Sequence, residues 1–522
     1  MHETFDVEVS IGLDESESES SLRAKVAGCL GREIQAGQPL TVVRRSLDAR
    51  HGHVRYRLMV RVGGDSSVAR QEERPPREVR LPARVLIVGD GPAGLFCAYE
   101  LARRGIASIV LDRGKPVQPR RHDLKAIHRD GHVDPNSNYC FGEGGAGTYS
   151  DGKLYTRAHK RGSIRDVLEI LVAHGAPPEV LVDARPHIGS NRLPRVVTAL
   201  REHLESVGVE FRFGAPVVDL VRGGRGIEGV RIADGREVFG DIVVLATGHS
   251  ARDVFGLLER HGARLQAKAF AVGVRIEHPQ ELIDRIQYGS AAGHPRLPPA
   301  SYRLSREIEG RGVFSFCMCP GGFVVPAATE ADGVVVNGMS LSRRGFAFAN
   351  SGLVVGVEVE DLTAAGLQGP CAGIELQRRL EQAAFRAGGG ALRAPAVRVA
   401  DFLAGRASST IGDTSYIPGL AATRLDEVLD AGGVAVAWRL RSALQAFGRS
   451  LRGYTTGDAV LIGVETRTSS PVRVLRHADS LEAQGLPRVY PCGEGAGYAG
   501  GIVSAALDGM RVASRVAAAL GD

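Results

Sequence analysis

Lysine is scarce in this chain of 522 residues, which has six lysines against 59 arginines. The formal net charge of +6 would ordinarily point to an anionic partner such as nucleic acid. The chain is also rich in glycine and alanine, so coding bias explains the arginine excess better than a ligand does. We therefore expect no nucleic-acid partner from charge alone.

Long apolar runs are also missing. No stretch of about 18 uninterrupted apolar residues occurs, which excludes a membrane-spanning helix. The first residues, Met-His-Glu-Thr-Phe-Asp, have neither the basic nor the apolar segment of a secretory signal. We therefore expect a cytoplasmic protein with no membrane partner. Hydrophobic residues make up 43% and charged residues 24% of the chain, as in globular proteins, and this length predicts two or three domains.

Cysteines are few, with seven in the chain. An odd number scattered over a long chain argues against a disulfide framework. Cys317 and Cys319 are close in sequence, but a CxC pair lacks the further ligands that a tetrahedral zinc site needs. We expect no metal. Buried packing thiols are the favoured interpretation of this pair, and a redox pair or a nucleophile facing a cofactor is the alternative.

The most informative stretch is residues 85–112. An apolar run at 85–88, a glycine-rich turn at 89–94, an amphipathic helix and a second apolar run at 106–111 follow one another. This order predicts a βαβ unit that binds a dinucleotide. The second apolar run ends on an acidic residue, as expected of a strand whose end meets a ribose.

Each residue of this turn has a physical task. Gly89 permits the tight turn, Gly91 lets the backbone approach a pyrophosphate, and Gly94 lets the helix pack on the strand. The pyrophosphate would lie at the helix N-terminus, where proline is tolerated and negative charge is favoured. The candidate dinucleotide-binding residues of this unit are Gly89, Gly91, Pro92, Ala93, Gly94, Asp112 and Arg113.

Residues 1–80 predict a small βαββ module. Polar and apolar residues alternate at 4–12, 40–47 and 53–62, and helical spacing occurs at 20–30. A solvated strand face is the favoured interpretation of its arginines, and a basic patch for RNA is the alternative, because no aromatic stacking platform accompanies them. The arginines are Arg44, Arg45, Arg50, Arg55, Arg57 and Arg61. A polar linker with two prolines is predicted at 71–79.

A second glycine-rich segment follows the βαβ unit. Five glycines occur in residues 142–152, which suits a backbone wrapped around a flat ring and a diphosphate. A flexible surface loop is the alternative. The cofactor candidates here are Gly145, Ala146, Gly147 and Thr148, and polar groups beside them come from Tyr149, Ser150, Asp151 and Lys153.

Later segments return to nucleotide chemistry. A strand pair interrupted at a proline (208–221), a hairpin with an Asp-Gly turn (229–239) and an apolar strand ending in Ala-Thr-Gly (241–248) precede the middle of the chain. Near the C-terminus, a strand enters a glycine loop (489–502) and a helix follows (503–520). This order is typical of two-nucleotide flavin folds.

Four long motifs then identify a family resemblance. They lie at residues 141–154, 316–322, 465–472 and 493–502. With the βαβ unit, they resemble the bacterial FAD-dependent dehydrogenases and oxidoreductases that have a single Rossmann-type FAD-binding domain and a small N-terminal module. The resemblance implies an α/β fold with a glutathione-reductase-like, two-nucleotide FAD-binding domain, an inserted α+β substrate domain and a small N-terminal α+β module.

The implied domains are the N-terminal module (1–80), the first part of the FAD-binding domain (81–255), the substrate domain (256–470) and the C-terminal part of the FAD-binding domain (471–522). No GxGxxG motif occurs in residues 256–470. NAD(P)H or another electron donor or acceptor would therefore act without a dedicated Rossmann site there.

The resemblance also assigns further FAD contacts. Val217 is expected near the adenine, an acid near the ribityl chain, and the last helix N-terminus near the flavin ring, where its dipole would stabilise an anionic reduced flavin. Asp112 stands where related enzymes often have glutamate. The assigned residues are Val217, Ala246, Thr247, Gly248, Gly493, Glu494, Gly501 and Ile502.

The predicted activity is hydride transfer between tightly bound FAD and a small organic substrate. Such a reaction needs positioning and a proton partner, and we expect residues 149–155 and 465–467 to supply both. The catalytic candidates are Lys153, Glu465, Arg467 and Tyr149, with Tyr498 bordering the pocket. The alternative is that Lys153, Glu465 and Arg467 form a buried ion-pair network. An alternative function is an RNA-modifying or RNA-binding flavoprotein that uses the N-terminal module.

Overall fold

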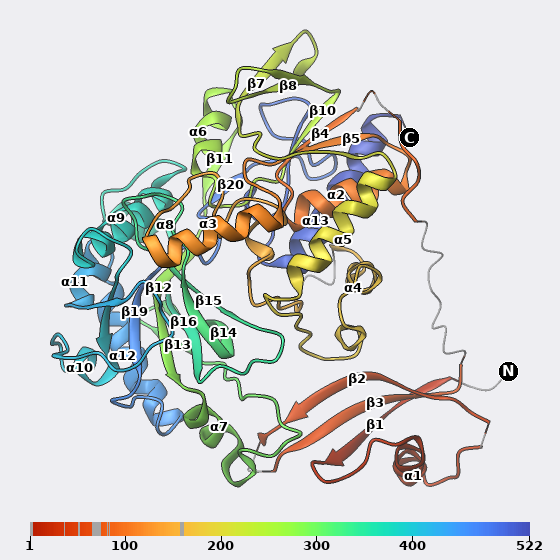
Figure 1. Ribbon diagram of the computed structural model, residues 1–522, viewed down its shortest axis with the longest axis vertical. Coiled ribbons are helices and arrows are strands. Elements are labelled where there is room, and N and C mark those ends of the chain that lie inside the picture. Colours follow the sequence, from red (N-terminus) through yellow and green to blue (C-terminus); the bar gives the residue numbers. More distant parts are fainter. Residues whose placement is uncertain are drawn as a thin grey trace.

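A parallel sheet and a larger, mostly antiparallel sheet form the two main parts of the molecule (Figure 1). The structure is a computed structural model. It describes residues 4–35, 37–50, 53–64, 75–80, 82, 84–156 and 161–521. Residues 71–74 of the predicted linker lie outside these ranges.

The parallel sheet has five strands in the order β21-β10-β4-β5-β6. Its strands are short and mostly buried on both faces, as expected of a parallel sheet covered by helices. They are β4 (Val85–Val88), β5 (Ser108–Leu111), β6 (Glu210–Arg212), β10 (Ile242–Leu245) and β21 (Val489–Pro491). The predicted βαβ unit is confirmed, with α2 (Pro92–Arg103) between β4 and β5.

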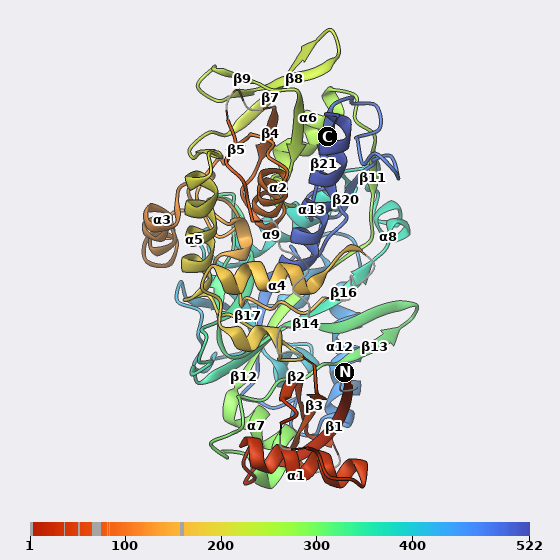
Figure 2. The ribbon, with the colours of Figure 1, turned by 90° about the vertical axis from the view of Figure 1, so that its right-hand side faces the viewer.

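Helices cover one face of this sheet and a small antiparallel sheet covers the other. The helices are α2, α4 (Ile164–Ala173), α5 (Leu193–Ser206) and α13 (Ile502–Ala519). On the other face lie α6 (Arg252–Arg260), β7 (Val217–Gly223), β8 (Gly226–Ile232) and β9 (Glu237–Phe239). The two views show α2 and α13 side by side under the sheet (Figures 1 and 2).

One predicted strand pair is wrong. Residues 208–221 form two strands on either side of Pro216, but β6 joins the edge of the parallel sheet whereas β7 pairs with β8. The chain turns at Gly214, which has a positive φ of 62°, and so the two strands enter different sheets. The predicted hairpin at 229–239 is confirmed.

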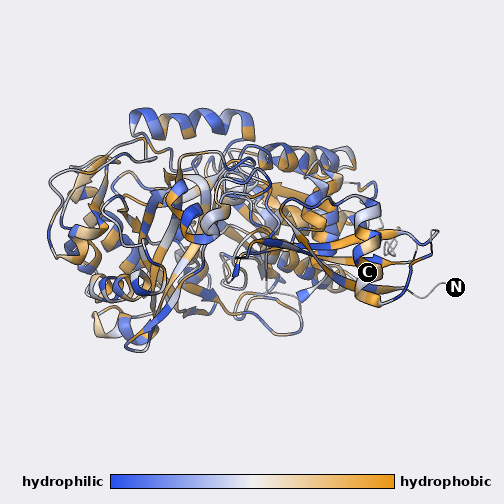
Figure 3. Ribbon diagram, turned by 90° about the horizontal axis from the view of Figure 1, so that it is seen from below, coloured by the Kyte–Doolittle hydropathy of each residue, from blue (hydrophilic) through white to orange (hydrophobic). Residues whose placement is uncertain are grey.

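The larger sheet has the order β13-β14-β16-β12-β19-β17-β18, and β15 pairs with β14. Its strands are β12 (Phe270–Pro279), β13 (Ser305–Ile308), β14 (Arg311–Pro326), β15 (Val336–Ser340), β16 (Phe348–Val357), β17 (Ala394–Arg398), β18 (Leu420–Ala422) and β19 (Val460–Glu465). Around it lie α7 (Gln280–Tyr288), α8 (Val359–Ala364), α9 (Ala372–Ala387), α10 (Val399–Leu403), α11 (Leu425–Asp430) and α12 (Val436–Ser450). Interior strands are largely apolar, whereas outer helices carry both kinds of residue (Figure 3).

The N-terminal module has the predicted βαββ elements. They are β1 (Phe5–Gly12), α1 (Glu19–Leu30), β2 (Leu40–Asp48) and β3 (Arg55–Val62), with sheet order β1-β3-β2. The module lies at one end of the molecule (Figure 1). Its β2 is bridged to residues 182–184 by backbone hydrogen bonds at Arg45, and Tyr56 Oη donates to the Arg296 carbonyl oxygen over 2.6 Å.

The remaining elements join these parts. Helix α3 (Val117–Asp130) follows β5, a short two-stranded sheet pairs β11 (Leu265–Ala267) with β20 (Val472–Val474), and 3-10 turns occur at η2 (Gly145–Gly147), η4 (Pro178–Leu181) and η5 (Gly289–Ala291). Within the described ranges, no helix has both the length and the apolar character needed to cross a membrane.

Candidate functional site

The glycines of the β4–α2 turn have different surroundings. Gly89 has a φ of 98°, and a Cβ on Gly94 would collide with the Gly89 carbonyl oxygen. Gly91 has an ordinary φ of −62°, and a Cβ there would have only Gly145 Cα nearby, at 3.9 Å. Gly89 and Gly94 are therefore needed by the fold, whereas Gly91 borders space that the fold itself does not fill.

Two helix N-termini near this turn are left without side-chain caps. The N-cap residues are Gly91 for α2 and Gly501 for α13, and a glycine has no side chain that could cap its helix. Pro92 at the start of α2 and Ile502 at the start of α13 both approach Gly147 of the glycine-rich loop. Uncapped N–H groups and two positive dipole ends thus lie beside one loop, which favours an anionic ligand.

The predicted cofactor segments meet as expected of one site. A Cβ on Gly89 would lie 2.5 Å from the Ala246 carbonyl oxygen, and one on Gly493 would lie 2.7 Å from Ala93 Cβ. The Gly495 backbone packs closely on Gly248. The turn after β4, the Ala246-Thr247-Gly248 turn after β10 and the Gly493-Glu494 turn after β21 therefore surround the carboxyl ends of three neighbouring parallel strands, where open α/β sheets bind ligands.

Arg120 organises the glycine-rich loop. Its guanidinium is fully buried and donates to the carbonyl oxygens of Asn138, Tyr139, Gly142, Glu143 and Gly145 over 2.8–3.1 Å. Thr148 Oγ1 donates to the Glu143 carbonyl oxygen over 2.7 Å. The alternative of a flexible surface loop is therefore wrong for this segment, because a buried charged group fixes its backbone.

Two acids lie under the turn. The Asp112 carboxylate accepts from the backbone N–H groups of Asp90, over 3.3 Å, and Gly114, over 2.7 Å. Burial, with the negative charge of Asp112 beside it, raises the pKa of Asp90 well above its usual range. Asp90 Oδ2 is buried without a hydrogen-bond partner among the described residues. The turn therefore contains an unsatisfied polar atom, which suits a site built for a ligand.

Glu494 is another acid of the site whose pKa is raised. Burial raises its pKa to about 7, although the Gly501 N–H donates to its carboxylate and Lys268 lies nearby. Val217 is buried at the start of β7. Arg113 departs from the predicted set, because its guanidinium pairs with Asp253 over 2.6 Å and stacks on Phe141, 4.7 Å from the ring centre.

Lys153 lies in a buried polar cluster. Its Nζ is 2.6 Å from Asp151 Oδ2, 3.6 Å from Cys317 Sγ and 3.5 Å from Cys319 Sγ. Burial disfavours the ammonium charge, but the two sulfurs and Asp151 outweigh it and raise the pKa of Lys153. The Asp151 carboxylate also accepts a hydrogen bond from the Ser340 hydroxyl, and His187 Nε2 lies 3.6 Å from its Oδ1 atom.

Glu465 belongs to the same cluster through Arg275. Both carboxylate oxygens of Glu465 lie 3.2 Å from Arg275 Nη1, and Arg275 Nη2 lies 3.8 Å from Cys319 Sγ. Burial raises the pKa of Glu465 to about 7 despite this pair. Lys153 and Glu465, which sequence reasoning selected, are thus both linked to the Cys317–Cys319 pair, Lys153 directly and Glu465 through Arg275.

Arg467 lies in a separate network. Glu381, only 2% exposed, accepts from Arg252 over 2.7 Å and from Arg467 over 3.1 Å. Arg467 also donates to Thr329 over 2.6 Å. Lys153, Glu465 and Arg467 each have an ion-pair partner, namely Asp151, Arg275 and Glu381, as the ion-pair alternative expected. These pairs are separate from one another, and both the catalytic and the ion-pair interpretation stay open.

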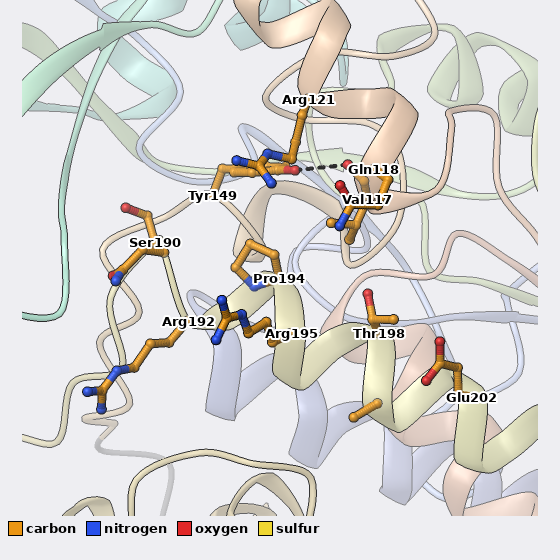
Figure 4. Close-up of a pocket in the computed structure, with 12 residues that line it drawn as sticks. Val117, Gln118, Arg121, Tyr149, Ser190, Arg192, Pro194, Arg195, Thr198 and Glu202 are labelled. Carbon is orange, nitrogen blue, oxygen red and sulfur yellow. Dashed lines mark hydrogen bonds between the residues drawn. The ribbon is translucent and has the colours of Figure 1, made fainter.

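Tyr149 borders a groove of about 630 Å³. Its hydroxyl donates to the Val117 carbonyl oxygen over 3.2 Å. Figure 4 shows Arg121 beside the Tyr149 ring, with Arg192 and Arg195 on the opposite wall. These three arginines have no ion pair within the described ranges. The groove is lined by residues 117–202 and not by the predicted substrate domain.

Sequence reasoning missed three buried charges, namely Arg120, Arg275 and Glu381. One signal was available for Arg275, because it interrupts the otherwise apolar run Phe270–Ile276. Arg120 and Glu381 lie on helices with ordinary charged faces, where nothing in the local pattern separates them from solvated residues.

The fold and these turns define a flavoprotein-type dinucleotide site. Family models match residues 82–125 ("FAD binding domain"), 189–332 ("FAD dependent oxidoreductase"), 269–468 ("FAD-dependent protein, C-terminal domain-like") and 1–63 ("Domain of unknown function"). An uncharacterised protein of Clostridium beijerinckii is 39% identical over 97% of each chain. The chain belongs to the FAD-dependent oxidoreductase family, and its cofactor is FAD.

Solved structures with similar folds include the flavin-dependent brominase Bmp2 and CtdE in complex with FAD. The first is 12% identical with a TM-score of 0.37, covering 84% of this chain and 80% of that one. The second is 12% identical with a TM-score of 0.34, covering 84% of both. At these TM-scores the likeness carries no argument about the reaction.

The residues present fit FAD. Gly91 borders unfilled space at an uncapped helix start, Asp90 Oδ2 is unsatisfied, and a second uncapped helix start lies close by. A diphosphate needs donors such as the N–H groups of those helix starts, and an adenosine ribose needs an acid at the end of the second strand. Asp112 occupies that place, at the end of β5.

Proposed function

We propose that this chain is an FAD-dependent dehydrogenase that transfers a hydride between tightly bound FAD and a small organic substrate. We further propose a glutathione-reductase-like, two-nucleotide FAD-binding domain formed by residues 81–255 and 471–522, with residues 256–470 inserted as the substrate domain and residues 1–80 as a separate module. The order of the parallel sheet supports this division, because β21 follows the larger sheet in the chain yet pairs with β10.

FAD, when bound, supplies a ring that accepts or donates a hydride. The chain would hold the diphosphate with the N–H groups of Gly91 and of Ala93 at the start of α2, and the adenosine ribose with Asp112. Glu494 is proposed to hold the ribityl chain. The α13 N-terminus at Gly501 would place a positive dipole end toward the bound ring.

One observation carries the proposed chemistry: Glu465 is only 2% exposed and has both carboxylate oxygens 3.2 Å from Arg275 Nη1. Burial raises its pKa to about 7. A carboxyl group with this pKa takes or gives a proton at neutral pH, as a general acid or base must. Lys153 keeps its charge, since its pKa is raised, and is proposed to hold a developing negative charge. Arg467, fixed by Glu381, is proposed to position substrate or cofactor without moving a proton.

The substrate is proposed to be anionic. Arg121, Arg192 and Arg195 bring three guanidiniums to the groove beside Tyr149, and a guanidinium fork matches a carboxylate. A volume of about 630 Å³ suits a small molecule. NAD(P)H or another donor or acceptor would complete the cycle without a dedicated Rossmann site.

The RNA alternative finds no support in the N-terminal module. Arg57 pairs with Glu8 and Asp48, Arg61 pairs with Asp6, and Arg45 pairs with Glu17. Arginines neutralised by neighbouring acids make a poor phosphate-binding surface.

The test is an anaerobic screen of small organic acids that follows the bleaching of the flavin. A substrate should reduce the wild-type flavin with a titration near pH 7, and Glu465→Gln should slow the reduction by roughly a hundredfold and remove that titration. Glu277→Gln is the matched control, because Glu277 is equally buried on β12 but is bound by Ser415 and Thr414. It should reduce normally.

Two outcomes would contradict the proposal. Equal rates in Glu465→Gln and Glu277→Gln would remove Glu465 from the chemistry. Reduction by NAD(P)H alone, followed by incorporation of an oxygen atom from O2 into the product, would identify a monooxygenase and not a dehydrogenase.

A further inference from the structure

The Cys317-Met318-Cys319 segment is a distorted part of β14. Its register with β16 shifts between Phe316 and Cys319, and Cys317 has a φ of 43°, which is unusual for a residue with a side chain. In a regular strand, residues two apart are about 6.6 Å apart along the chain. A residue in the left-handed conformation shortens that span, and both sulfurs lie within 3.6 Å of one nitrogen, Lys153 Nζ.

Two cations face these thiols. Lys153 Nζ contacts both sulfurs, and Arg275 Nη2 contacts Cys319 Sγ as well as the Cys317 carbonyl oxygen, the latter over 3.0 Å. Cys319 Sγ lies 3.2 Å from the Cys317 carbonyl oxygen. Cys317 keeps part of its surface accessible, whereas Cys319 is buried.

Packing thiols elsewhere in the chain look different. Cys97 and Cys492 are buried in the apolar core of the parallel sheet, and burial raises the pKa of each. At Cys317, a hydrogen bond with Cys319 and the charges of Lys153 and Arg275 outweigh burial and hold the pKa well below its usual range, while burial raises that of Cys319. The remaining charged groups of the cluster, Asp151 and Glu465, oppose this effect.

We propose that Cys317 and Cys319 form a redox-active dithiol, with Cys317 as the attacking thiolate and Cys319 as the resolving thiol. Two geometric features support this proposal. Both sulfurs contact the Lys153 ammonium group, and β14, which carries the two cysteines, is bent at Cys317. This activity is distinct from hydride transfer, and it replaces the interpretation of the pair as packing thiols.

The oxidant in this reaction is a small-molecule disulfide. Cys317 Sγ attacks one of its sulfurs, which forms a mixed disulfide and releases one thiolate. Cys319 then attacks Cys317 Sγ, its proton passes to the second departing thiol, and an intramolecular disulfide remains. Two protein sulfurs are oxidised and one external disulfide is reduced to a thiol and a thiolate. Protein disulfides need Cα atoms about 4.4–6.8 Å apart, and residues two apart in a regular strand are already about 6.6 Å apart.

The first test measures alkylation of the FAD-loaded protein by iodoacetamide as a function of pH, with peptides counted by mass spectrometry. The readout is the pH at which alkylation is half-maximal. A rate measured at one pH would be misleading, because a thiolate of lower pKa is also a weaker nucleophile. Cys317 should have a midpoint below pH 7. Cys371 is the internal control, since it is also half-buried but burial raises its pKa.

Variants separate the cation from general packing. Lys153→Met should raise the Cys317 midpoint by at least about one pH unit, and Lys153→Arg should keep it low. Lys115→Met is the matched control, because Lys115 pairs with Asp123 and Asp134 and makes no contact with either thiol among the described residues. It should leave the Cys317 midpoint unchanged. A Cys317 midpoint equal to that of Cys371 in the wild type would overturn the proposal.

The second test treats the reduced holoprotein with oxidised glutathione. Wild-type protein should lose both alkylation sites to an intramolecular Cys317–Cys319 bond, and Cys319→Ser should trap glutathione on Cys317. Neither readout depends on flavin reduction. The dithiol proposal would be refuted if Cys317 and Cys319 were still alkylated after this treatment. It would also be refuted if the Cys319→Ser protein trapped no glutathione.

Discussion

Replacing Glu381 with glutamine is expected to destabilise the protein strongly. Glu381 is 2% exposed and is the shared partner of two buried guanidiniums, those of Arg252 and Arg467, and of the Thr466 hydroxyl. Glutamine keeps the shape but removes the charge. Two buried cations would then lose their counter-ion, and breaking a buried pair in this way costs about 3–5 kcal/mol.

The pKa of Glu381 gives an independent magnitude. Burial alone would raise it, but Arg467 and Arg252 lower it from 4.5 to about 2. Since each pKa unit corresponds to about 1.4 kcal/mol, the shift is worth about 3 kcal/mol. A pKa that folding lowers gives stability that is fully present above the unfolded pKa and disappears as the pH falls from 4.5 toward 2. At pH 3 about half should remain.

The assay is urea unfolding followed by fluorescence of Trp438, the single tryptophan of the chain, which lies on α12 beside the larger sheet. The difference between wild type and Glu381→Gln should be about 3 kcal/mol at pH 7 and about half of that at pH 3. Glu375→Gln on the same helix is the control, because the Glu375 side chain is 40% exposed and, within the described ranges, pairs with Arg378 and Arg379 alone. It should differ from wild type by less than about 0.5 kcal/mol. A difference that does not change with pH would refute the electrostatic explanation.

Three further variants test the rest of the site. Gly91→Val should fold but purify without FAD, because its side chain fits the protein yet occupies the pyrophosphate position, and Gly28→Val on α1 should stay yellow; a yellow Gly91→Val protein would contradict the assignment. Arg120→Lys should lose FAD and show new proteolytic cleavage in the glycine-rich loop, since one ammonium cannot bind five carbonyl oxygens. The double variant with Arg275→Met and Glu465→Leu should have a free energy of unfolding within about 1–2 kcal/mol of the wild-type value but should lose flavin reduction by substrate. A misfolded double variant would show that the pair is structural.

Local signals predicted the parts of the fold that are contiguous in the chain. The glycine turn at 89–94, the Asp-Gly hairpin and the last helix each depend on residues that are close in sequence, and all are found. The order of the larger sheet was not predicted, because β12 lies between β16 and β19 through pairings that no local pattern records.

The site shows the same division. Lys153 and Glu465 were selected because each stands in a polar, glycine-rich or hydroxyl-rich segment. Their partners were not found, since Arg275 and Glu465 are 190 residues apart in the chain and only the assembled sheet brings them together. The arginines that line the groove at Tyr149 escaped for a different reason, because exposed arginines are common throughout this sequence.

Arg275 shows why the buried cluster is better explained by chemistry than by stability. Strand β12 is fully buried at Phe270–Ile276, and Arg275 is its one charged residue there. A β-branched or aliphatic side chain at this position would pack without needing a polar partner. A buried ion pair contributes little or nothing relative to apolar residues of the same size. The guanidinium instead holds Asn350, the Cys317 carbonyl oxygen and Glu465 in one arrangement. It thereby fixes the bent strand at the two thiols and leaves Glu465 with a pKa near neutrality, two properties that an apolar residue at this position would remove.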